Sequence, residues 1–373
     1  MPKTLRNVYF KKLTFENLIN AHYRAILGKR DRKETLLFEM DLETNIANLY
    51  DDLLTNNYKL GKYRTFTIYE PKERIIKSLP YRDRVVHQWY VEEFIKPIFI
   101  PKFIKDTYAC INDRGTHLCY AQTQKYMRHM QNKYGTYYIL KGDIKKYFYS
   151  INKDILLKIL KKTIKDENLL ELTKKLIYDD GEIKGIPIGN YTSQYFANIY
   201  LSELDYFVKH KLHIKYYLRF MDDFVLLLPT KKECQEVLAK IRTFLTEELD
   251  LELNQKTRYY PNKFGCNFCG YVIHEHYTLL RRRCIINIKR KMRKHNLNLK
   301  DFYGHLKHAN CYNFVQKIQE ECNRLDKLSK LEQKVLTLYL QGLSYDAIAE
   351  QLGKTEKAVD NALQRIRTKL SRK

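Results

Sequence analysis

A run of apolar and aromatic residues extends from position 217 to 228, and two adjacent acids, Asp222 and Asp223, interrupt it. The residues on either side of the acids are of the kind that forms strands. Because burial of an unpaired carboxylate is strongly unfavourable, the two acids are expected at a turn, in a cleft or beside cations. This segment alone is compatible with two interpretations, a metal site or an ordinary hairpin turn that carries two acids.

A second strand-like run, residues 137–141, ends at Gly142 and Asp143. Two strands that each end in carboxylates can place these three acids around two divalent ions roughly 3.5 to 4 Å apart. Carboxylate oxygens suit Mg²⁺, with Mn²⁺ as an alternative. Such a pair of ions supports in-line phosphoryl displacement, so the sequence predicts that chemistry for the three aspartates.

The last part of the chain has a helical period. Apolar residues recur at helical spacing from 328 to 370, with breaks at Gly342 and Gly353. Ser329 and Ser344 supply capping side chains for helix starts. The pattern predicts a small helix-turn-helix unit.

The charge of the chain indicates a polyanionic partner. The formal net charge is +25, of which only +4 lies in residues 326–373, so +21 lies in residues 1–325. Basic side chains that neutralise phosphates release condensed counterions, which favours nucleic acid binding by the main body of the chain. No apolar run approaches the ~20 residues that span a bilayer, and the first residues lack a signal-peptide core. We therefore expect a cytoplasmic protein with no membrane partner.

Several ordered blocks resemble those of reverse transcriptases. They are the basic segments 71–76 and 81–86, the aspartate block 143–151, the segment 185–194, the Met-Asp-Asp segment 221–223, and the late blocks 253–257 and 268–272. Each block alone is weakly diagnostic, but the ordered set is specific and covers about residues 45–280. The resemblance implies an RNA-directed DNA polymerase whose partners are a template RNA, a primer or cDNA strand and dNTPs.

The resemblance also implies an architecture. The fold class would be α+β, a right-hand polymerase with fingers, a palm built on an antiparallel sheet and a helical thumb, followed by a small all-α helix-turn-helix domain. The expected segments are 1–135 for an amino-terminal helical segment and the fingers, 136–278 for the palm, 279–325 for the thumb and 326–373 for the helix-turn-helix domain.

The same blocks imply roles for individual residues. The metal site is expected to comprise Asp143, Ile144, Asp222 and Asp223, with the three aspartates as catalytic residues. Lys256 is expected to act as a general acid near the pyrophosphate. Phe148 is expected to collide with a 2′-hydroxyl and so to select deoxynucleotides. The other substrate-binding residues are expected to be Lys72, Arg74, Ile188, Gly189 and Gln194; the first two, two residues apart on a strand, would share a face.

The segment 186–194 favours one branch of the family. Most bacterial relatives have Gln-Gly where this chain has Ile188 and Gly189, and the pattern with Ser193-Gln194 is similar to reverse transcriptases of diversity-generating retroelements, within the group II intron-like bacterial branch. Replacing the Gln side-chain amide by an aliphatic side chain near the incoming nucleotide removes hydrogen bonds that depend on base-pair geometry, which should lower discrimination between bases. The resemblance implies error-prone copying and a small basic accessory protein. A defence-associated standalone reverse transcriptase is the alternative.

Residues 344–353 and 359–367 resemble region 4 of bacterial sigma factors. If the last helix lies in a major groove, its polar face would contact bases and phosphates of a target DNA. The residues on that face are Lys357, Asn361, Gln364 and Arg365. A three-helix unit that contacts protein is the alternative.

Two functions of different classes therefore stay open. One is an active RNA-directed DNA polymerase, and the other is a DNA-binding regulator whose polymerase body is an inactive scaffold. The three acids favour the polymerase, because mutually repelling carboxylates have no physical reason to persist without cations.

Overall fold

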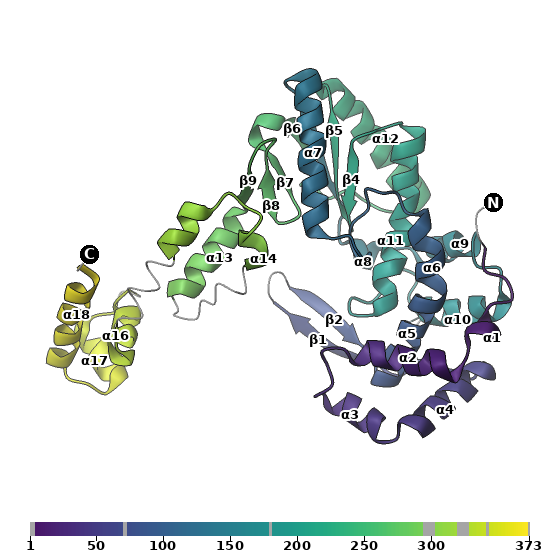
Figure 1. Cartoon of the computed structure of the whole chain (residues 1–373), viewed down its shortest axis with the longest axis horizontal. Coiled ribbons are helices and arrows are strands. Elements are labelled where there is room, and N and C mark those ends of the chain that lie inside the picture. Colours follow the sequence, from purple (N-terminus) through teal and green to yellow (C-terminus); the bar gives the residue numbers. More distant parts are fainter. Residues whose placement is uncertain are drawn as a thin grey trace. The chain divides into compact units, whose positions relative to one another are not determined.

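The computed structural model describes residues 4–69, 73–178, 181–293, 303–318, 328–340 and 343–371. The chain separates into two compact units, residues 1–264 and 265–373, whose elements are labelled in Figure 1. The predicted combination of helices with sheet is confirmed. Lys72, predicted to bind substrate, lies outside the described residues.

The first unit contains most of the helices and two of the sheets. Its helices are α1 (Tyr9–Lys12), α2 (Phe15–Ile26), α3 (Lys33–Met40), α4 (Leu42–Leu54), α5 (Tyr81–Tyr90), η1 (Val91–Ile95), α6 (Lys96–Phe99), η2 (Ile100–Lys102), α7 (Thr116–Tyr134), α8 (Tyr147–Ser150), α9 (Lys153–Lys161), α10 (Glu167–Ile177), α11 (Tyr191–Tyr206), η3 (Phe207–Lys211), α12 (Lys231–Leu249) and η4 (Asn262–Phe264). Its strands are β1 (Arg64–Ile68), β2 (Arg74–Ser78), β3 (Tyr138–Asp143), β4 (Tyr217–Phe220), β5 (Asp223–Leu228) and β6 (Arg258–Pro261).

Four antiparallel strands form the main sheet, in the order β4-β5-β3-β6. Helix α7 packs against β4 and β5, and α12 packs against β3, β5 and β6. All residues of β5 after Asp223 are buried, which explains why this strand is apolar without alternation. The sheet therefore provides a rigid support for the residues at its strand ends.

Helix α11 lies in the middle of the largest buried cluster. It contacts α5, α9 and α12, and its side chains Phe196 and Tyr200 are almost completely buried. The residues just before it, 185–190, are thereby attached to the core at their carboxyl end. This anchoring fixes the position of the segment that carries Ile188 and Gly189.

Strands β1 and β2 form a separate antiparallel hairpin, paired from Arg64 with Ser78 to Ile68 with Arg74. Every residue of β1 is exposed, and the hairpin carries exposed apolar side chains such as Phe66 and Ile75. Because it lacks a buried face, the hairpin depends on its attachments to the rest of the unit.

The second unit begins with a small antiparallel sheet and continues as helices. Its elements are β7 (Cys266–Phe268), β8 (Tyr271–Ile273), β9 (Thr278–Leu280), α13 (Arg282–Arg293), α14 (Tyr303–Leu306), α16 (Lys330–Leu340), α17 (Tyr345–Leu352) and α18 (Glu356–Ser371). The strands β7, β8 and β9 pair with one another in that order. Segments predicted to complete the palm thus form a sheet of their own.

The last three helices surround a core of their own. Its buried residues are Leu328, Val335, Ile348, Ala349, Val359, Ala362, Leu363 and Ile366. Ser344 accepts a hydrogen bond from the Ala347 N–H, and Gly353, with φ +58°, ends α17. The predicted start and end of this helix are confirmed, as is helical structure in the described parts of 328–370.

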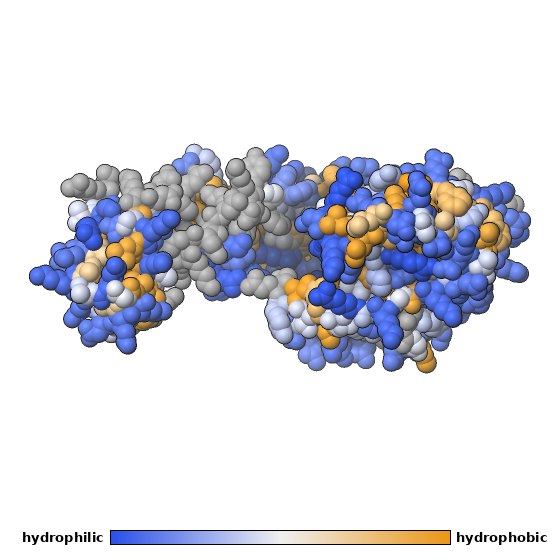
Figure 2. Space-filling view, turned by 90° about the horizontal axis from the view of Figure 1, so that it is seen from below, coloured by the Kyte–Doolittle hydropathy of each residue, from blue (hydrophilic) through white to orange (hydrophobic). Residues whose placement is uncertain are grey.

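Hydrophilic residues cover most of the face seen in Figure 2. This surface agrees with the 30% of charged residues in the sequence. Within the described ranges, every helix is too short or too polar to cross a bilayer.

Candidate active site

Met221 and Asp222 form the two-residue turn of the β4–β5 hairpin, because Phe220 pairs with Asp223. Met221 has φ +59°, a conformation that residues with a side chain seldom adopt. Turns with positive φ at this position match the twist of a hairpin. The acids that interrupt the apolar run therefore lie at and beside a tight turn, as predicted.

Asp143 lies directly opposite Asp223 in the register of β3 and β5. Side chains of directly opposed residues project from the same face, with Cβ atoms about 4.5–5.5 Å apart. Lys141, two residues before Asp143, shares that face by strand alternation. The structure thus brings two of the predicted acids together across the strands and places Asp222 next to them in the turn.

The charges around these acids are partly balanced by the protein itself. Lys141 Nζ lies 2.8 Å from Asp223 Oδ2, and both side chains are about one quarter exposed. Burial raises the pKa of Tyr147 well above its usual value, and the negative charge of Asp222 contributes to the same shift. Asp222 is therefore within electrostatic reach of the segment that follows Asp143.

Oxygen ligands at the ends of paired strands are suited to a divalent cation. Among the described residues, no group of three or more His, Cys, Asp and Glu side chains is arranged to hold a metal ion. The Lys141 ammonium contacts Asp223 and neutralises part of its negative charge, as a bound cation would. Donor type and strand position fit a divalent ion, which would compete with the Lys141 ammonium for Asp223.

The loop after α12 attaches to the backbone of Asp143. The Asn254 N–H donates to the Asp143 carbonyl at 2.7 Å, and the Asp143 N–H donates to Thr257 Oγ1 at 3.3 Å. Lys256 lies between these two contacts and is exposed. Ile144 is buried and forms an isolated β-bridge with Leu253. Because its side chain has no donor atom for a metal, only its backbone carbonyl could bind an ion.

The segment with Ile188 and Gly189 lies against the β1–β2 hairpin. The Lys77 N–H of β2 donates to the Ile188 carbonyl at 3.0 Å. Gly189 has φ +126°, and a Cβ there would lie 2.7 Å from the Lys77 carbonyl oxygen. Asn190 donates to the Tyr63 hydroxyl at 2.6 Å. This segment thus joins the hairpin to α11 by close backbone contact.

Phe148 is half-buried, and its carbonyl accepts a hydrogen bond from the Ile186 N–H at 2.8 Å. The aspartate block and the Ile188 segment are therefore neighbours. Gln194 is exposed in the first turn of α11. Arg74 is exposed at the end of β2, opposite Ile68.

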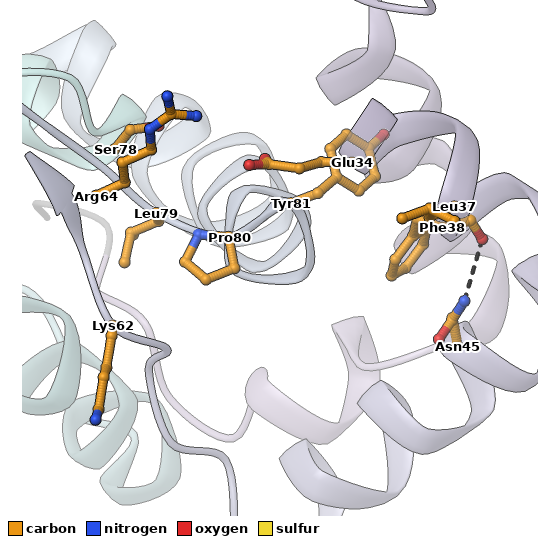
Figure 3. Close-up of a pocket in the computed structure, with 10 residues that line it drawn as sticks. All are labelled: Glu34, Leu37, Phe38, Asn45, Lys62, Arg64, Ser78, Leu79, Pro80 and Tyr81. Carbon is orange, nitrogen blue, oxygen red and sulfur yellow. Dashed lines mark hydrogen bonds between the residues drawn. The ribbon is translucent and has the colours of Figure 1, made fainter. Parts of the chain in front are cut away.

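A hollow of about 430 Å³ lies elsewhere in the first unit, between α3, α4 and the base of the hairpin (Figure 3). Glu34, Lys62 and Arg64 are among its lining residues, and Asn45 donates to the Phe38 carbonyl at its edge. Its lining includes none of the predicted site residues, so we do not assign it to the candidate active site.

Residues 68–273 match the family described as reverse transcriptase (RNA-dependent DNA polymerase). The chain belongs to the reverse transcriptase family. The three aspartates, Gly189 and Lys256 all lie within the matched segment of this reverse transcriptase. Residues 323–370 match the family described as Sigma-70, region 4, so the chain also carries a sigma-like helix-turn-helix domain.

Some relatives match the reverse transcriptase part of the chain, and others match the sigma-like domain. Protein YkfC of Escherichia coli (strain K12) is 24% identical over 284 residues, covering 63% of this reverse transcriptase and 72% of that protein. The RNA polymerase sigma-H factor of Bacillus licheniformis is 56% identical over 45 residues, 12% of this chain. The chain spans only 20% of the length of that factor. A solved structure of telomerase from Candida albicans, with a fragment of telomeric RNA, has a TM-score of 0.45 at 12% identity and covers 86% of this chain and 67% of its own.

Sequence reasoning missed two charged residues near the candidate site. Lys141 contacts Asp223, and Arg219, in the middle of β4, is fully buried beside the turn. Lysine two positions before Asp143, on the same strand face, could have indicated the first contact. An arginine inside an apolar strand could have indicated a buried partner for the second.

Proposed function

We propose that the protein is an RNA-directed DNA polymerase that copies a template RNA into cDNA by two-metal phosphoryl transfer. The observation that carries the proposal is the position of Asp143 directly opposite Asp223, with Asp222 in the adjoining turn. Family membership agrees with this reading. The inactive-scaffold alternative does not account for acids placed opposite each other at strand ends.

Asp143, Asp222 and Asp223 would bind the ions through carboxylate oxygens, and Ile144 would add its carbonyl. When bound, two Mg²⁺ ions would lower the pKa of a primer 3′-hydroxyl and neutralise charge on the triphosphate. Lys141 would exchange its contact with Asp223 for another acceptor. Lys256, exposed on the loop that is hydrogen-bonded to Asp143, would donate a proton to the departing pyrophosphate.

The nucleotide would lie against the surface that the hairpin and the Ile188 segment form together. Arg74 supplies an exposed cation for the triphosphate, as Lys72 would. Gly189 keeps the backbone close to β2 without a side chain, and Ile188 presents an aliphatic surface where an amide could have formed hydrogen bonds. Gln194 would contact the template or the nucleotide from α11.

The direct test is primer extension with purified protein on an RNA template. We expect DNA product that depends on dNTPs and on Mg²⁺ or Mn²⁺. Absence of product on RNA and DNA templates alike, from folded protein with both ions, would favour the scaffold.

Replacing Phe148 by Val should raise ribonucleotide incorporation relative to deoxynucleotide incorporation by on the order of tenfold, because a smaller side chain removes the collision with a 2′-hydroxyl. The ratio is measured by single-nucleotide extension with dNTP and rNTP. Tyr149→Val is the matched control, since Tyr149 is an adjacent and exposed aromatic residue. If Tyr149→Val raised the ratio and Phe148→Val did not, Tyr149 would be the residue that selects deoxynucleotides.

Within the family, we place this enzyme in a diversity-generating retroelement. Ile188 followed by Gly189 and the Ser193-Gln194 pair supports this choice. In the neighbouring DNA, a near-duplicate repeat pair that differs mainly at adenines would agree with it. Without such a pair, the defence-associated role is the better explanation. The same proposal includes a small basic accessory protein as a partner.

The right-hand architecture is also a proposal, with residues 1–135 as amino-terminal segment and fingers, 136–278 as palm, 279–325 as thumb and 326–373 as helix-turn-helix domain. The exposed β1–β2 hairpin and the antiparallel sheet around β3 support the first two assignments. Helix α13, rich in Lys and Arg, supports a thumb that follows the duplex backbone.

We propose further that α18 binds duplex DNA. Lys357, Asn361 and Gln364 are exposed at helical spacing, while the opposite face of α18 is buried in the domain core. Arg365 is exposed but lies 3.6 Å from Glu332, so part of its charge is used within the domain. Burial acts to raise the pKa of Glu332, but hydrogen bonds from Lys369 and Ser329 lower it.

Replacing both Asn361 and Gln364 by Ala should weaken binding to the preferred duplex by about 1–3 kcal/mol per lost base contact, while the domain stays folded, because both side chains are exposed. Lys357→Ala should weaken binding to all duplexes. Lys330→Ala, an equal charge change at an exposed position at the start of α16, is its control. Fluorescence anisotropy with selected duplexes measures both. Unchanged affinity in all variants would support the protein-contact alternative.

A further inference from the structure

Arg219 is a fully buried cation in the apolar strand β4, and its partner Asp205, near the end of α11, is 1% exposed. The contact is bidentate, with Nε to Oδ1 at 2.7 Å and Nη2 to Oδ2 at 2.6 Å. Burial acts to lower the pKa of Arg219, but the Asp205 carboxylate raises it above its usual value. The guanidinium is therefore a permanent charge inside the core.

The remaining N–H groups of Arg219 are also used. Nη1 donates to Asn198 Oδ1 and to the Met221 carbonyl, each at 3.0 Å, and Nη2 donates to the Asn198 carbonyl at 3.4 Å. An arginine has five N–H donors, and all five have acceptors here. Asp205 in turn accepts from Tyr217 and Thr107 hydroxyls. Asn198 also donates to the Ala109 carbonyl at 2.8 Å, and the contact of Arg219 with the Met221 carbonyl connects the network to the hairpin turn.

That contact fixes the peptide between Met221 and Asp222. The Met221 carbonyl belongs to a turn residue held at φ +59°, so the turn needs support from the rest of the structure. The peptide that Arg219 binds carries Asp222 on its other side. Its orientation therefore sets the direction in which Asp222 leaves the turn, and the adjoining Asp223 begins the strand opposite Asp143.

Buried ion pairs are seldom retained for stability, because apolar residues of similar volume are often as stable. This one is bidentate, has every donor used, and lies beneath the candidate catalytic turn. We propose that Arg219 is a positioning residue, which holds the Met221–Asp222 turn so that Asp222 and Asp223 are presented to divalent ions together with Asp143. The metal part of this inference rests on the proposed function, whereas the effect on the turn does not.

The test is the double variant Asp205→Leu with Arg219→Met, in which both charges are replaced by apolar side chains. We expect it to fold, since neither charge is left unpaired. Amide hydrogen exchange at residues 221–223, measured without metal or nucleic acid, should be at least tenfold faster than in the wild type. Binding of Mn²⁺ alone, measured by calorimetry, should weaken about 10- to 100-fold, as when outer-shell partners are removed.

Arg84→Met is the matched control, since Arg84 is a partly buried arginine that donates to the Leu79 carbonyl and the Ser78 hydroxyl, away from the turn and from Asp205. It should leave exchange at 221–223 unchanged. Arg219→Lys keeps a charge against Asp205 but lacks the planar fork. It should also accelerate exchange at the turn, and it decides the matter if the double variant does not fold.

Wild-type exchange and wild-type Mn²⁺ binding in a folded double variant would overturn the positioning role. Failure of the proposed function has a different signature. In that case the wild type extends no primer, but the double variant still exchanges faster at the turn than the wild type does.

Discussion

Asp222→Asn should reduce RNA-templated DNA synthesis by on the order of 10³-fold, with little change in thermal stability. The substitution keeps the size of the side chain but removes the negative charge that would bind a divalent ion. Asp222 lies in the hairpin turn, beside the two acids that face each other across β3 and β5. Steady-state primer extension at several Mg²⁺ concentrations measures the loss.

Glu252→Gln is the matched control for Asp222→Asn. Glu252 is an exposed acid close in the chain to Lys256, and its partner is Lys145 at 2.7 Å. Its neutralisation should leave synthesis within about twofold of wild type, because a surface ion pair contributes little. Equal synthesis by wild type and Asp222→Asn would contradict a catalytic role for the turn.

Gly189→Ala should lower nucleotide incorporation by about 10²-fold, as expected when a binding group is displaced by about 1 Å. A Cβ at this position would lie 2.7 Å from the Lys77 carbonyl oxygen, which is backbone and cannot rotate away, and φ is +126°. The Ile188 segment would have to separate from β2. Pre-steady-state incorporation of a single dNTP measures the effect.

Gly28→Ala is the control that separates the two causes of the effect expected for Gly189→Ala, which are backbone strain and the steric clash with β2. Gly28 has φ +68°, but a Cβ there meets no atom within 4 Å. It should reduce stability by about 1 kcal/mol through backbone strain and leave incorporation unchanged. If Gly189→Ala behaves in the same way, the segment does not take part in nucleotide binding.

The acids of the candidate site could be proposed from the sequence because they break an otherwise apolar pattern. Asp222 and Asp223 interrupt one strand-like run and Asp143 ends another, and burial of free carboxylates is unfavourable enough to make such breaks informative. The turn at Met221 and Asp222 follows from the same reasoning. The register that sets Asp143 opposite Asp223 could not be read locally, because strand pairing joins segments about eighty residues apart.

Other features depend on contacts between distant segments and were not predictable. Arg219 binds Asp205 and the Met221 carbonyl, and nothing in the spacing of these residues indicates a closed network. The strands β7, β8 and β9 have short strand patterns that do not reveal which sheet they join. By contrast, α17 was predictable together with its ends, since Ser344 and Gly353 act within a few residues of their own position.

Whether the three aspartates bind the catalytic metal is tested by a crystal structure of the protein, from crystals soaked with Mn²⁺ and an incoming nucleotide, with the metal located by its anomalous signal. We expect Mn²⁺ bound by oxygens of Asp143, Asp222 and Asp223, with Lys141 moved away from Asp223. Mn²⁺ bound elsewhere, with the Lys141 contact intact, would contradict this expectation.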